Sequence, residues 1–229
     1  MSEIALSLND VHVVYTRSRQ VVLQGFSMSV HKGELVCLLG VSGCGKTTVL
    51  RTVAGLERLQ QGEIFISQRC VAGAGIHLPP EKRRVGMVFQ EYALFPHLTV
   101  TQNVAFGLRH LPYELQHARV TELLKMVELL SCAKRYPHEL SGGQQQRIAL
   151  ARALAPAPDI LLLDEPFSSL DKQTSEYLVK EVRDLLRSSG QTALIVTHNE
   201  SEALEISNRI CIMTEGNISS VNRPGNPGD

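Results

Sequence analysis

The sequence predicts an α/β fold with a mostly parallel core sheet flanked by helices, an antiparallel β subdomain and an inserted helical subdomain. Three observations support this prediction. Short runs of apolar residues without polar alternation indicate strands, helical patterns separate several of these runs, and one long stretch carries no convincing strand pattern. Strands that helices cover on both faces have this continuous apolar character because neither face contacts water.

The first two strands are predicted from a different pattern. Residues 4–15 and 21–30 alternate roughly between apolar and polar side chains. A period of two residues is typical of a strand with one buried face, so we expect these segments to pair as antiparallel strands.

The core sheet is predicted from four apolar runs, and polar or glycine-rich residues follow each of them. The runs are residues 35–39, 85–89, 160–163 and 193–197, with helical patterns at about 46–56, 172–189 and 199–206. Ligands bind at the carboxyl ends of strands in open α/β sheets. The sequence therefore predicts a functional site at this edge of the sheet.

The chain is expected to form a single domain over residues 1–229. In this prediction, residues of about 1–90 and 156–220 form the core with the β subdomain, and residues of about 91–155 form the helical subdomain. Residues 221–229 are rich in Pro, Gly and Asn and show no packing pattern, so we expect a disordered tail there.

Composition excludes several classes of protein. The chain has 229 residues, is 43% hydrophobic and 20% charged, and has a formal net charge of zero, which argues against a dedicated nucleic-acid binder. The five cysteines contain no CxxC pair and are expected to be reduced, mostly buried thiols. The first residues lack a basic segment, and no apolar window approaches ~20 residues, so neither a signal peptide nor a membrane span is predicted.

A phosphate-binding loop is predicted at Gly40–Thr48, "GVSGCGKTT". It follows a strand, precedes a helix and matches the spacing G-x-x-x-x-G-K-[ST]. Glycines let main-chain N–H groups surround a phosphate, Lys46 can reach the β- and γ-phosphates, and Thr47 can ligate Mg²⁺. The alternative is a strand-to-helix turn that binds nothing. No guanine-reading N-K-x-D motif is present, so a GTPase is disfavoured.

Two acids, Asp164 and Glu165, end the apolar run "ILLL". Successive strand side chains point to opposite faces, so we expect the two carboxylates to have different roles. Asp164 is predicted to hold the Mg²⁺ shell and Glu165 to polarise an attacking water. Considered without the phosphate-binding loop, both would be interpreted as solvated residues of a turn.

Gln90 and His198 end two further strands of the predicted sheet. The Gln90 amide oxygen could ligate Mg²⁺ or water, and His198 could donate to a γ-phosphate. Either residue alone would more often be structural. Their expected position on one sheet edge with the phosphate-binding loop favours a functional role.

A second glycine-containing stretch, "LSGGQQQR", spans Leu140–Arg147 and precedes an apolar-rich helical pattern. Ser141 and Gln144 have the spacing of a capping box, which would satisfy main-chain N–H groups at the start of a helix. The same helix N-terminus could instead face a phosphate. These two interpretations are compatible.

With this stretch included, the chain resembles the nucleotide-binding subunit of ATP-binding-cassette (ABC) transporters over nearly its whole length. The resemblance implies a P-loop NTPase cassette in which Tyr15 stacks on adenine. The matching motifs are the Walker A loop (Gly40–Thr48), the Q-loop (Gln90), the signature (Leu140–Gln144), Walker B with the catalytic glutamate (Asp164, Glu165), the D-loop (Ser169–Asp171) and the switch histidine (His198).

The resemblance assigns a role to each matching residue. The catalytic residues would be Glu165, His198 and Gln90, and the metal ligands Thr47, Gln90 and Asp164. The nucleotide-binding residues would be Tyr15, Gly40, Val41, Ser42, Gly43, Cys44, Gly45, Lys46, Thr47, Thr48, Gln90, Asp164, Ser141, Gly142, Gly143, Gln144, Asp171 and His198.

The resemblance also implies cofactors and partners. ATP and Mg²⁺ would bind between two cassettes, a homodimer or a pair of close paralogues, with the signature of one facing the Walker A loop of the other. The dimer would act at the cytoplasmic face of the inner membrane, on permease subunits and, indirectly, on a periplasmic or lipid-anchored substrate-binding protein. No nucleic-acid partner is expected.

The sequence resembles bacterial importers for ferric iron, polyamines, sugars or osmoprotectants, and a ferric-iron importer is the expected type. Long members of that group continue into a C-terminal regulatory domain, whereas this sequence stops at Asp229. Asn199 also follows the switch histidine where the group usually has an acid. Two alternatives are a non-transport ABC ATPase acting on nucleic acid or ribosomes, and an ATP-binding regulatory module without turnover.

Overall fold

The computed structural model describes residues 3–15 and 20–224. The strands are β1 (Ile4–Tyr15), β2 (Gln20–His31), β3 (Leu35–Leu39), β4 (Gln61–Ile66), β5 (Arg69–Gly73), β6 (Ile76–His77), β7 (Val85–Val88), β8 (Ile160–Asp164), β9 (Ala193–Thr197), β10 (Arg209–Thr214) and β11 (Asn217–Asn222). The α-helices are α1 (Lys46–Ala54), α2 (Val100–Ala105), α3 (Tyr113–Met126), α4 (Gly142–Leu154), α5 (Lys172–Ser188) and α6 (Glu200–Ile206). Short 3₁₀ turns lie at Pro80–Lys82, Phe106–Leu108, Leu130–Cys132 and Pro137–Glu139.

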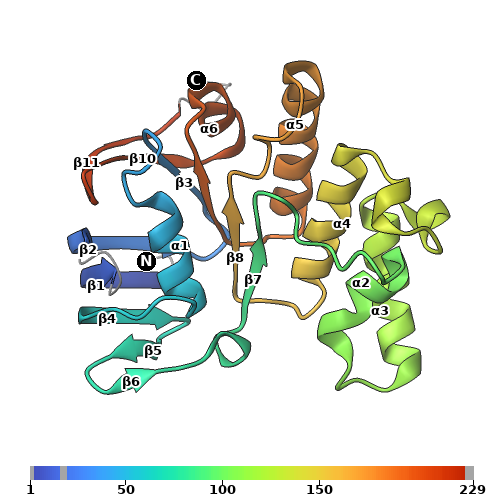
Figure 1. Cartoon of the computed structure of the whole chain (residues 1–229), viewed down its shortest axis with the longest axis horizontal. Coiled ribbons are helices and arrows are strands. Elements are labelled where there is room, and N and C mark those ends of the chain that lie inside the picture. Colours follow the sequence, from blue (N-terminus) through green and yellow to red (C-terminus); the bar gives the residue numbers. More distant parts are fainter. Residues whose placement is uncertain (1–2, 16–19, 225–229) are drawn as a thin grey trace.

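The strands form two sheets (Figure 1). One is antiparallel, with strand order β2-β1-β4-β5-β6, and the other has the order β11-β10-β3-β9-β8-β7. In the second sheet the strands from β10 to β7 are parallel, and only β11 runs antiparallel to its neighbour. This arrangement confirms the predicted α/β fold and the antiparallel pairing of the first two strands.

The four predicted core strands are adjacent in the order β3-β9-β8-β7. Because they are parallel, their carboxyl ends meet at one edge of the sheet. Register confirms this alignment: Leu39 pairs with Thr197, Asp164 with Val196, and Val88 with Leu163. The segments that follow these strands therefore lie side by side, as the sequence predicts.

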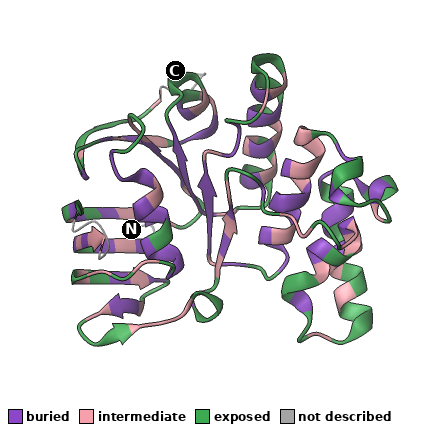
Figure 2. Ribbon diagram, viewed as in Figure 1, coloured by how far each residue is buried: buried purple, intermediate pink, exposed green. Residues whose placement is uncertain are grey.

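Helices cover the mostly parallel sheet on both faces, and its strands are buried accordingly (Figure 2). Along β8, Ile160 and Leu162 pack in one core cluster with α1 and the antiparallel sheet, whereas Leu161 and Leu163 pack in the other with helices α2 to α5. The uninterrupted apolar run "ILLL" results from this two-sided burial. Helix α1 lies between the two sheets (Figure 1).

The region of residues 91–155, all of which the structure describes, contains helices and 3₁₀ turns and no strand. The division of the chain into subdomains stays a prediction. Its expected tail begins too early, because residues 221 and 222 complete the hydrogen-bonded ladder of β10 and β11. Residues 223 and 224 follow that strand, and residues 225–229 lie outside the described residues. Among the residues that are described, no helix has the length and apolar character to cross a bilayer.

Candidate functional site

The loop Gly40–Thr48 connects β3 to α1, as its spacing predicts. Gly43 and Gly45 have φ angles of 84° and 107°, in the left-handed region that favours glycine. At Gly40 a Cβ atom would lie 2.5 Å from the Met213 carbonyl oxygen of β10. The loop therefore requires glycine at these positions, at two for their backbone conformation and at one for the close approach of a neighbouring strand.

The Lys46 side chain lies inside this loop and is 4% exposed. Its ammonium donates to the carbonyl oxygens of Gly40 at 2.6 Å and Val41 at 2.9 Å. A lysine ammonium has three donors and no acceptor, so these bonds hold the cation where the loop turns. Val41 itself is exposed, whereas Cys44 is buried.

Thr47 and Asp164, two of the three predicted metal ligands, contact each other. The Thr47 hydroxyl donates to Asp164 Oδ1 at 2.9 Å across the gap between α1 and β8. Asp164 is 7% exposed, and its pKa is raised by burial and by the neighbouring Glu165 carboxylate, which together outweigh the hydrogen bond from Thr47. A buried carboxylate with this shift favours a cation beside it.

Glu165 and His198 also form a pair. His198 Nδ1 lies 3.1 Å from Glu165 Oε2, and the two side chains are 51% and 17% exposed. Because an ionised carboxylate only accepts hydrogen bonds, Nδ1 is the donor in this contact. The structure thus places two of the three predicted catalytic residues, which directly follow β8 and β9, within hydrogen-bonding distance.

Glu165 and Asp164 have different partners, but for a different reason than the predicted strand alternation. Strand β8 ends at Asp164, and Glu165 follows it with a φ angle of 43°, in the left-handed region. The main chain turns at Glu165, so its side chain also lines the cavity of the phosphate-binding loop. The alternation of strand side chains therefore does not reach this residue.

One cavity of about 330 Å³ brings the phosphate-binding loop and Glu165 together, and Asp164 and His198 adjoin it through their hydrogen bonds to Thr47 and Glu165. Tyr15 lies at its wall, with its hydroxyl 2.7 Å from Thr48 Oγ1. Gln20 and Val22 of β2 also line the cavity; the sequence contained no motif that pointed to them. The lining residues are Tyr15, Gln20, Val22, Ser42, Gly43, Gly45, Lys46, Thr47, Thr48 and Glu165.

Gln90 lies at the same sheet edge but outside this set. It follows β7 by two residues and is exposed, and the described residues that line the cavity do not include it. Tyr92, two residues further along, has a φ angle of 58° and places its hydroxyl 2.6 Å from Ser169 Oγ. This bond joins the segment after Gln90 to the predicted D-loop, a link that no sequence motif indicated.

The stretch Leu140–Arg147 forms the start of α4, and its predicted capping box is present. Gln144 N donates to Ser141 Oγ at 3.4 Å, and Ser141 N donates to Gln144 Oε1 at 3.0 Å. Cβ atoms at the two glycines would lie 3.0 Å from Leu170, two residues before α5, for Gly142 and 2.9 Å from Leu178 of α5 for Gly143. A Cβ atom at either position would therefore require one of these leucine side chains to shift.

Asp171 begins α5 and caps it. Its Oδ1 accepts a hydrogen bond from Thr174 N at 3.0 Å. Bonds from Thr174 lower the pKa of the Asp171 carboxyl, so this exposed acid is ionised at neutral pH. Neither Asp171 nor any signature residue is among the described residues that line the cavity of the phosphate-binding loop.

Comparison with known proteins identifies the family. Residues 23–168 match the family described as "ABC transporter", which covers more than half of the chain. The chain belongs to the ABC transporter family. The phosphate-binding loop, the signature and the acids that end β8 all lie inside the matched residues.

Several relatives of this chain are named import ATP-binding proteins. A Fe(3+) ions import ATP-binding protein of Haemophilus influenzae is 44% identical over 209 residues, which cover 90% of this chain and 60% of the relative. A sulfate/thiosulfate import ATP-binding protein of Chromobacterium violaceum is 50% identical, covering 86% and 53%. A spermidine/putrescine import ATP-binding protein of Legionella pneumophila is 48% identical, covering 89% and 55%. The chain thus spans somewhat more than half the length of these relatives.

Solved structures confirm the predicted ABC cassette fold. The dimeric, post-hydrolysis structure of the ATP-binding cassette MJ0796 bound to ADP and Pi has a TM-score of 0.82 and 32% identity, and covers 96% of this chain and 99% of that one. The cbiO1 protein of Clostridium perfringens, part of an ABC transporter complex, has a TM-score of 0.86 and 27% identity, covering 97% and 89%.

Proposed function

We propose that this chain binds and hydrolyses ATP and thereby powers import across the bacterial inner membrane through a partner permease. The observation that carries the proposal is the single site in which Lys46, the Thr47–Asp164 pair and the Glu165–His198 pair meet at one sheet edge. The names of its import relatives and a neighbouring structure with bound ADP and Pi support this assignment.

ATP would lie along the phosphate-binding loop, with its phosphates against the N–H groups of residues 43–48 and the N-terminus of α1. The adenine would lie at the other end of the cavity, where Tyr15 and Val22 offer an aromatic ring and an apolar side chain. Lys46, now bonded to loop carbonyls, would exchange those acceptors for phosphate oxygens.

The site fits Mg²⁺ through the oxygen atoms of Thr47 and Asp164, which already lie 2.9 Å apart. Hydroxyl and carboxylate oxygens are ligands that Mg²⁺ prefers, and Gln90 could add an amide oxygen from the same edge. When bound, the ion would neutralise charge on the β- and γ-phosphates. The raised pKa of Asp164 is consistent with a cation completing this site.

Glu165 would orient and polarise the attacking water, and His198 would contact the γ-phosphate. In the present arrangement His198 Nδ1 donates to Glu165. Its Nε2 can therefore donate to a phosphate only when the ring is protonated on both nitrogens or has left Glu165. When ATP binds, we therefore expect either the Glu165–His198 hydrogen bond to break or the His198 ring to carry a proton on both nitrogens.

The signature would complete the site of a second subunit. Within one chain, Ser141 precedes α4, whose apolar residues pack in a different core cluster from those of α1. Ser141 does not line the cavity of the phosphate-binding loop. The N-terminus of α4 can face a γ-phosphate that a partner subunit holds, in a homodimer or a pair of close paralogues. The dimeric state of similar cassettes supports this arrangement.

The cargo is proposed to be ferric iron, on the names of relatives that are 44–47% identical. In such a system the permease and an external, periplasmic or lipid-anchored binding protein would select the cargo, and this chain would act at the cytoplasmic face. Co-purification from membranes with a hydrophobic permease tests the transport role. Recovery with ribosomes or nucleic acid instead would favour a non-transport ATPase.

The test of the ATPase assignment is Glu165→Gln. We expect this variant to bind ATP as the wild type does, to lose turnover and to accumulate as an ATP-bound dimer, because the water is no longer polarised. Equilibrium ATP binding, phosphate release and size-exclusion chromatography measure the three properties. Wild-type turnover in this variant would contradict the assignment.

A further inference from the structure

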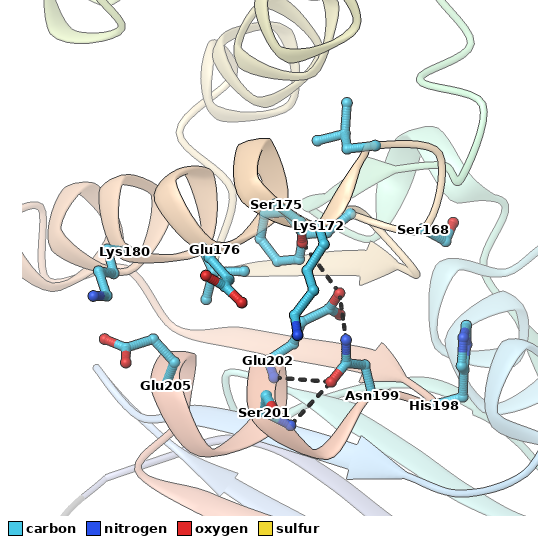
Figure 3. A pocket seen from close by; sticks show the side chains of 13 residues that line it. Ser168, Lys172, Ser175, Glu176, Lys180, His198, Asn199, Ser201, Glu202 and Glu205 are labelled. Carbon is cyan, nitrogen blue, oxygen red and sulfur yellow. Dashed lines mark hydrogen bonds between the residues drawn. The ribbon is translucent and has the colours of Figure 1, made fainter.

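A polar network joins α5 to α6 beside the exposed His198 side chain (Figure 3). It lies along a pocket of about 480 Å³ that His198, Asn199 and Glu202 line on one side and α5 on the other. Glu202, in the first turn of α6, is the acceptor at the centre of this network.

Three side chains donate to the Glu202 carboxylate. Thr197 Oγ1 donates to Oε2 at 2.7 Å, while Ser175 Oγ and Asn199 Nδ2 each donate to Oε1 at 3.3 Å. Ser175 and Thr197 are buried. An ionised carboxylate has no donor of its own and can accept all three bonds at once.

Two of these donors flank His198 in the chain. The Thr197 hydroxyl, which donates to Glu202, also accepts a hydrogen bond from Asn199 N at 3.0 Å. Asn199 Oδ1 in turn accepts from the main-chain N–H groups of Ser201 and Glu202 at the start of α6. The main chain around His198 is therefore held from both sides, and the common anchor of both sides is the Glu202 carboxylate.

The third donor connects the network to the D-loop. Ser175 lies in the first turn of α5, where its N–H donates to the Asp171 carbonyl at 2.9 Å. The same helix start is capped by the Asp171 carboxylate. A displacement of α5 at its N-terminus would thus reach the His198 turn through the bond between Ser175 and Glu202.

We propose that Glu202 is a positioning residue for ATP hydrolysis, which fixes the His198 turn against Glu165 and couples it to α5. The inference rests on the proposed function, because it concerns the geometry of the same reaction. Glu202 contacts neither the cavity of the phosphate-binding loop nor Glu165, so it acts through His198.

Asparagine at residue 199 fits this role better than an aspartate would. Its amide both caps α6 and donates to Glu202. An aspartate could cap the helix but could not donate, and it would place a second carboxylate against Glu202. The asparagine and the glutamate therefore act as a complementary pair.

The test compares turnover, ATP affinity and thermal stability in Glu202→Gln, with Glu205→Gln as the matched control. A glutamine at residue 202 would present its own NH₂ group to one of the three donors. We expect kcat to fall roughly 10- to 100-fold, as for a small misplacement of a reacting group, with little change in ATP affinity. Glu205 lies on the same helix and the same pocket but pairs with Arg183, so its variant should turn over normally.

Coupling to His198 separates positioning from a merely structural role. In a His198→Ala background, Glu202→Gln should cause no further loss of kcat, because it acts only through the ring. Thr197→Val and Thr197→Ser give a second comparison, in which the Glu202 carboxylate is unchanged. The valine variant should lose turnover because it lacks the hydroxyl that donates to Glu202. The serine variant keeps that hydroxyl and should retain turnover.

A folded Glu202→Gln protein with wild-type kcat overturns the inference. So does a double variant in which Glu202→Gln lowers kcat further than His198→Ala alone. If Glu202→Gln fails to fold, equal turnover in the two Thr197 variants overturns it instead. Wild-type protein without turnover would contradict the proposed function itself, whereas an active wild type with a silent Glu202→Gln contradicts only the role of Glu202.

Discussion

The Arg83 guanidinium is 2% exposed and lies at the carboxyl end of the phosphate-loop helix α1. It donates to the carbonyl oxygens of Thr52 at 2.7 Å, Val53 at 3.0 Å and Leu78 at 2.7 Å. Burial lowers its pKa to about 10, so it is still a cation at neutral pH. A single side chain thus satisfies main-chain acceptors at the end of α1 and in the segment that follows β6.

Replacing Arg83 with methionine should destabilise the fold by about 3 kcal/mol, because it leaves buried carbonyl groups without a donor. Urea denaturation measures this free energy of unfolding. The matched control is Arg84→Met. Arg84 is 66% exposed and pairs with Asp159 at the surface, so its loss should cost at most about 1 kcal/mol. Equal effects of the two variants would contradict this account of Arg83.

His77 receives a proton less readily in the folded chain than in the unfolded one. Burial and the neighbouring Arg83 and Arg58 cations lower its pKa below the ordinary value of 6.5. Below that value the unfolded chain binds the proton and the folded chain resists it, so this residue's contribution to stability falls as the pH drops through 6.5. Between pH 8 and pH 5.5, the free energy of unfolding should fall further in the wild type than in His77→Gln, as denaturation at the two pH values would measure.

At the scale of the element, the start of α4 combines two demands on the same residues. The Ser141–Gln144 capping box satisfies N–H groups of the helix, and the adjacent glycines allow α5 and Leu170 to pack closely. Both features are explained within one chain. The proposed contact with a phosphate of the partner adds a demand that stability alone does not impose.

Two substitutions of Ser141 should separate these demands. Ser141→Ala removes the cap acceptor and should lower the free energy of unfolding by about 1 kcal/mol. Ser141→Asp keeps an acceptor but adds a negative charge where the phosphate is proposed to bind, so stability should hold while turnover falls steeply. Denaturation and phosphate release measure the two effects. Normal turnover in a well-folded Ser141→Asp protein would argue against a phosphate at this turn.

The fully buried core strands could be predicted from the sequence, and several partly exposed strands could not. The core strands were predictable because burial on both faces leaves uninterrupted apolar runs such as 35–39 and 193–197. Strands β4, β5 and β6 were missed because exposed or half-buried positions break up their apolar pattern, and β4 and β5 also contain glycine, at Gly62 and Gly73. Strand β11 was assigned in part to a tail because its pattern is largely polar.

The residues of the site also fall into those that the sequence predicted and those that it did not. Spacing predicted the phosphate-binding loop and its strand-to-helix setting, and chain order predicted the edge that carries Asp164 and His198. The turn at Glu165 and the contribution of Val22 depend on backbone conformation and strand pairing, which no local pattern encodes. The same holds for the bond between Tyr92 and Ser169, which are far apart in the sequence.

At the scale of the whole molecule, the two glycine-rich loops belong to different core clusters on opposite faces of the sheet. In the proposed dimer each ATP would use the Lys46 loop of one chain and the Ser141 turn of the other. The unit of activity would then be the pair of chains.

Mixing two inactive variants tests this arrangement. Lys46→Ala should disable the phosphate-binding loop and Ser141→Arg the signature, so each homodimer should lack turnover. A mixed dimer contains one site built from the intact loop of one chain and the intact signature of the other, so mixing should restore phosphate release. A mixture that forms mixed dimers, as native mass spectrometry would show, and yet remains inactive would contradict sharing of sites between chains.

The neighbours of β3 have a consequence for synthesis of the chain. This strand leads into the phosphate-binding loop, yet both strands that pair with it, β9 and β10, come from residues beyond 190. On the ribosome, the apolar segment Leu35–Leu39 therefore has neither partner strand until residues beyond 190 have been translated. A nascent or truncated chain that ends before β9 would leave this strand unpaired on both edges and prone to aggregation. Completion of the nucleotide site would consequently be among the last events of folding.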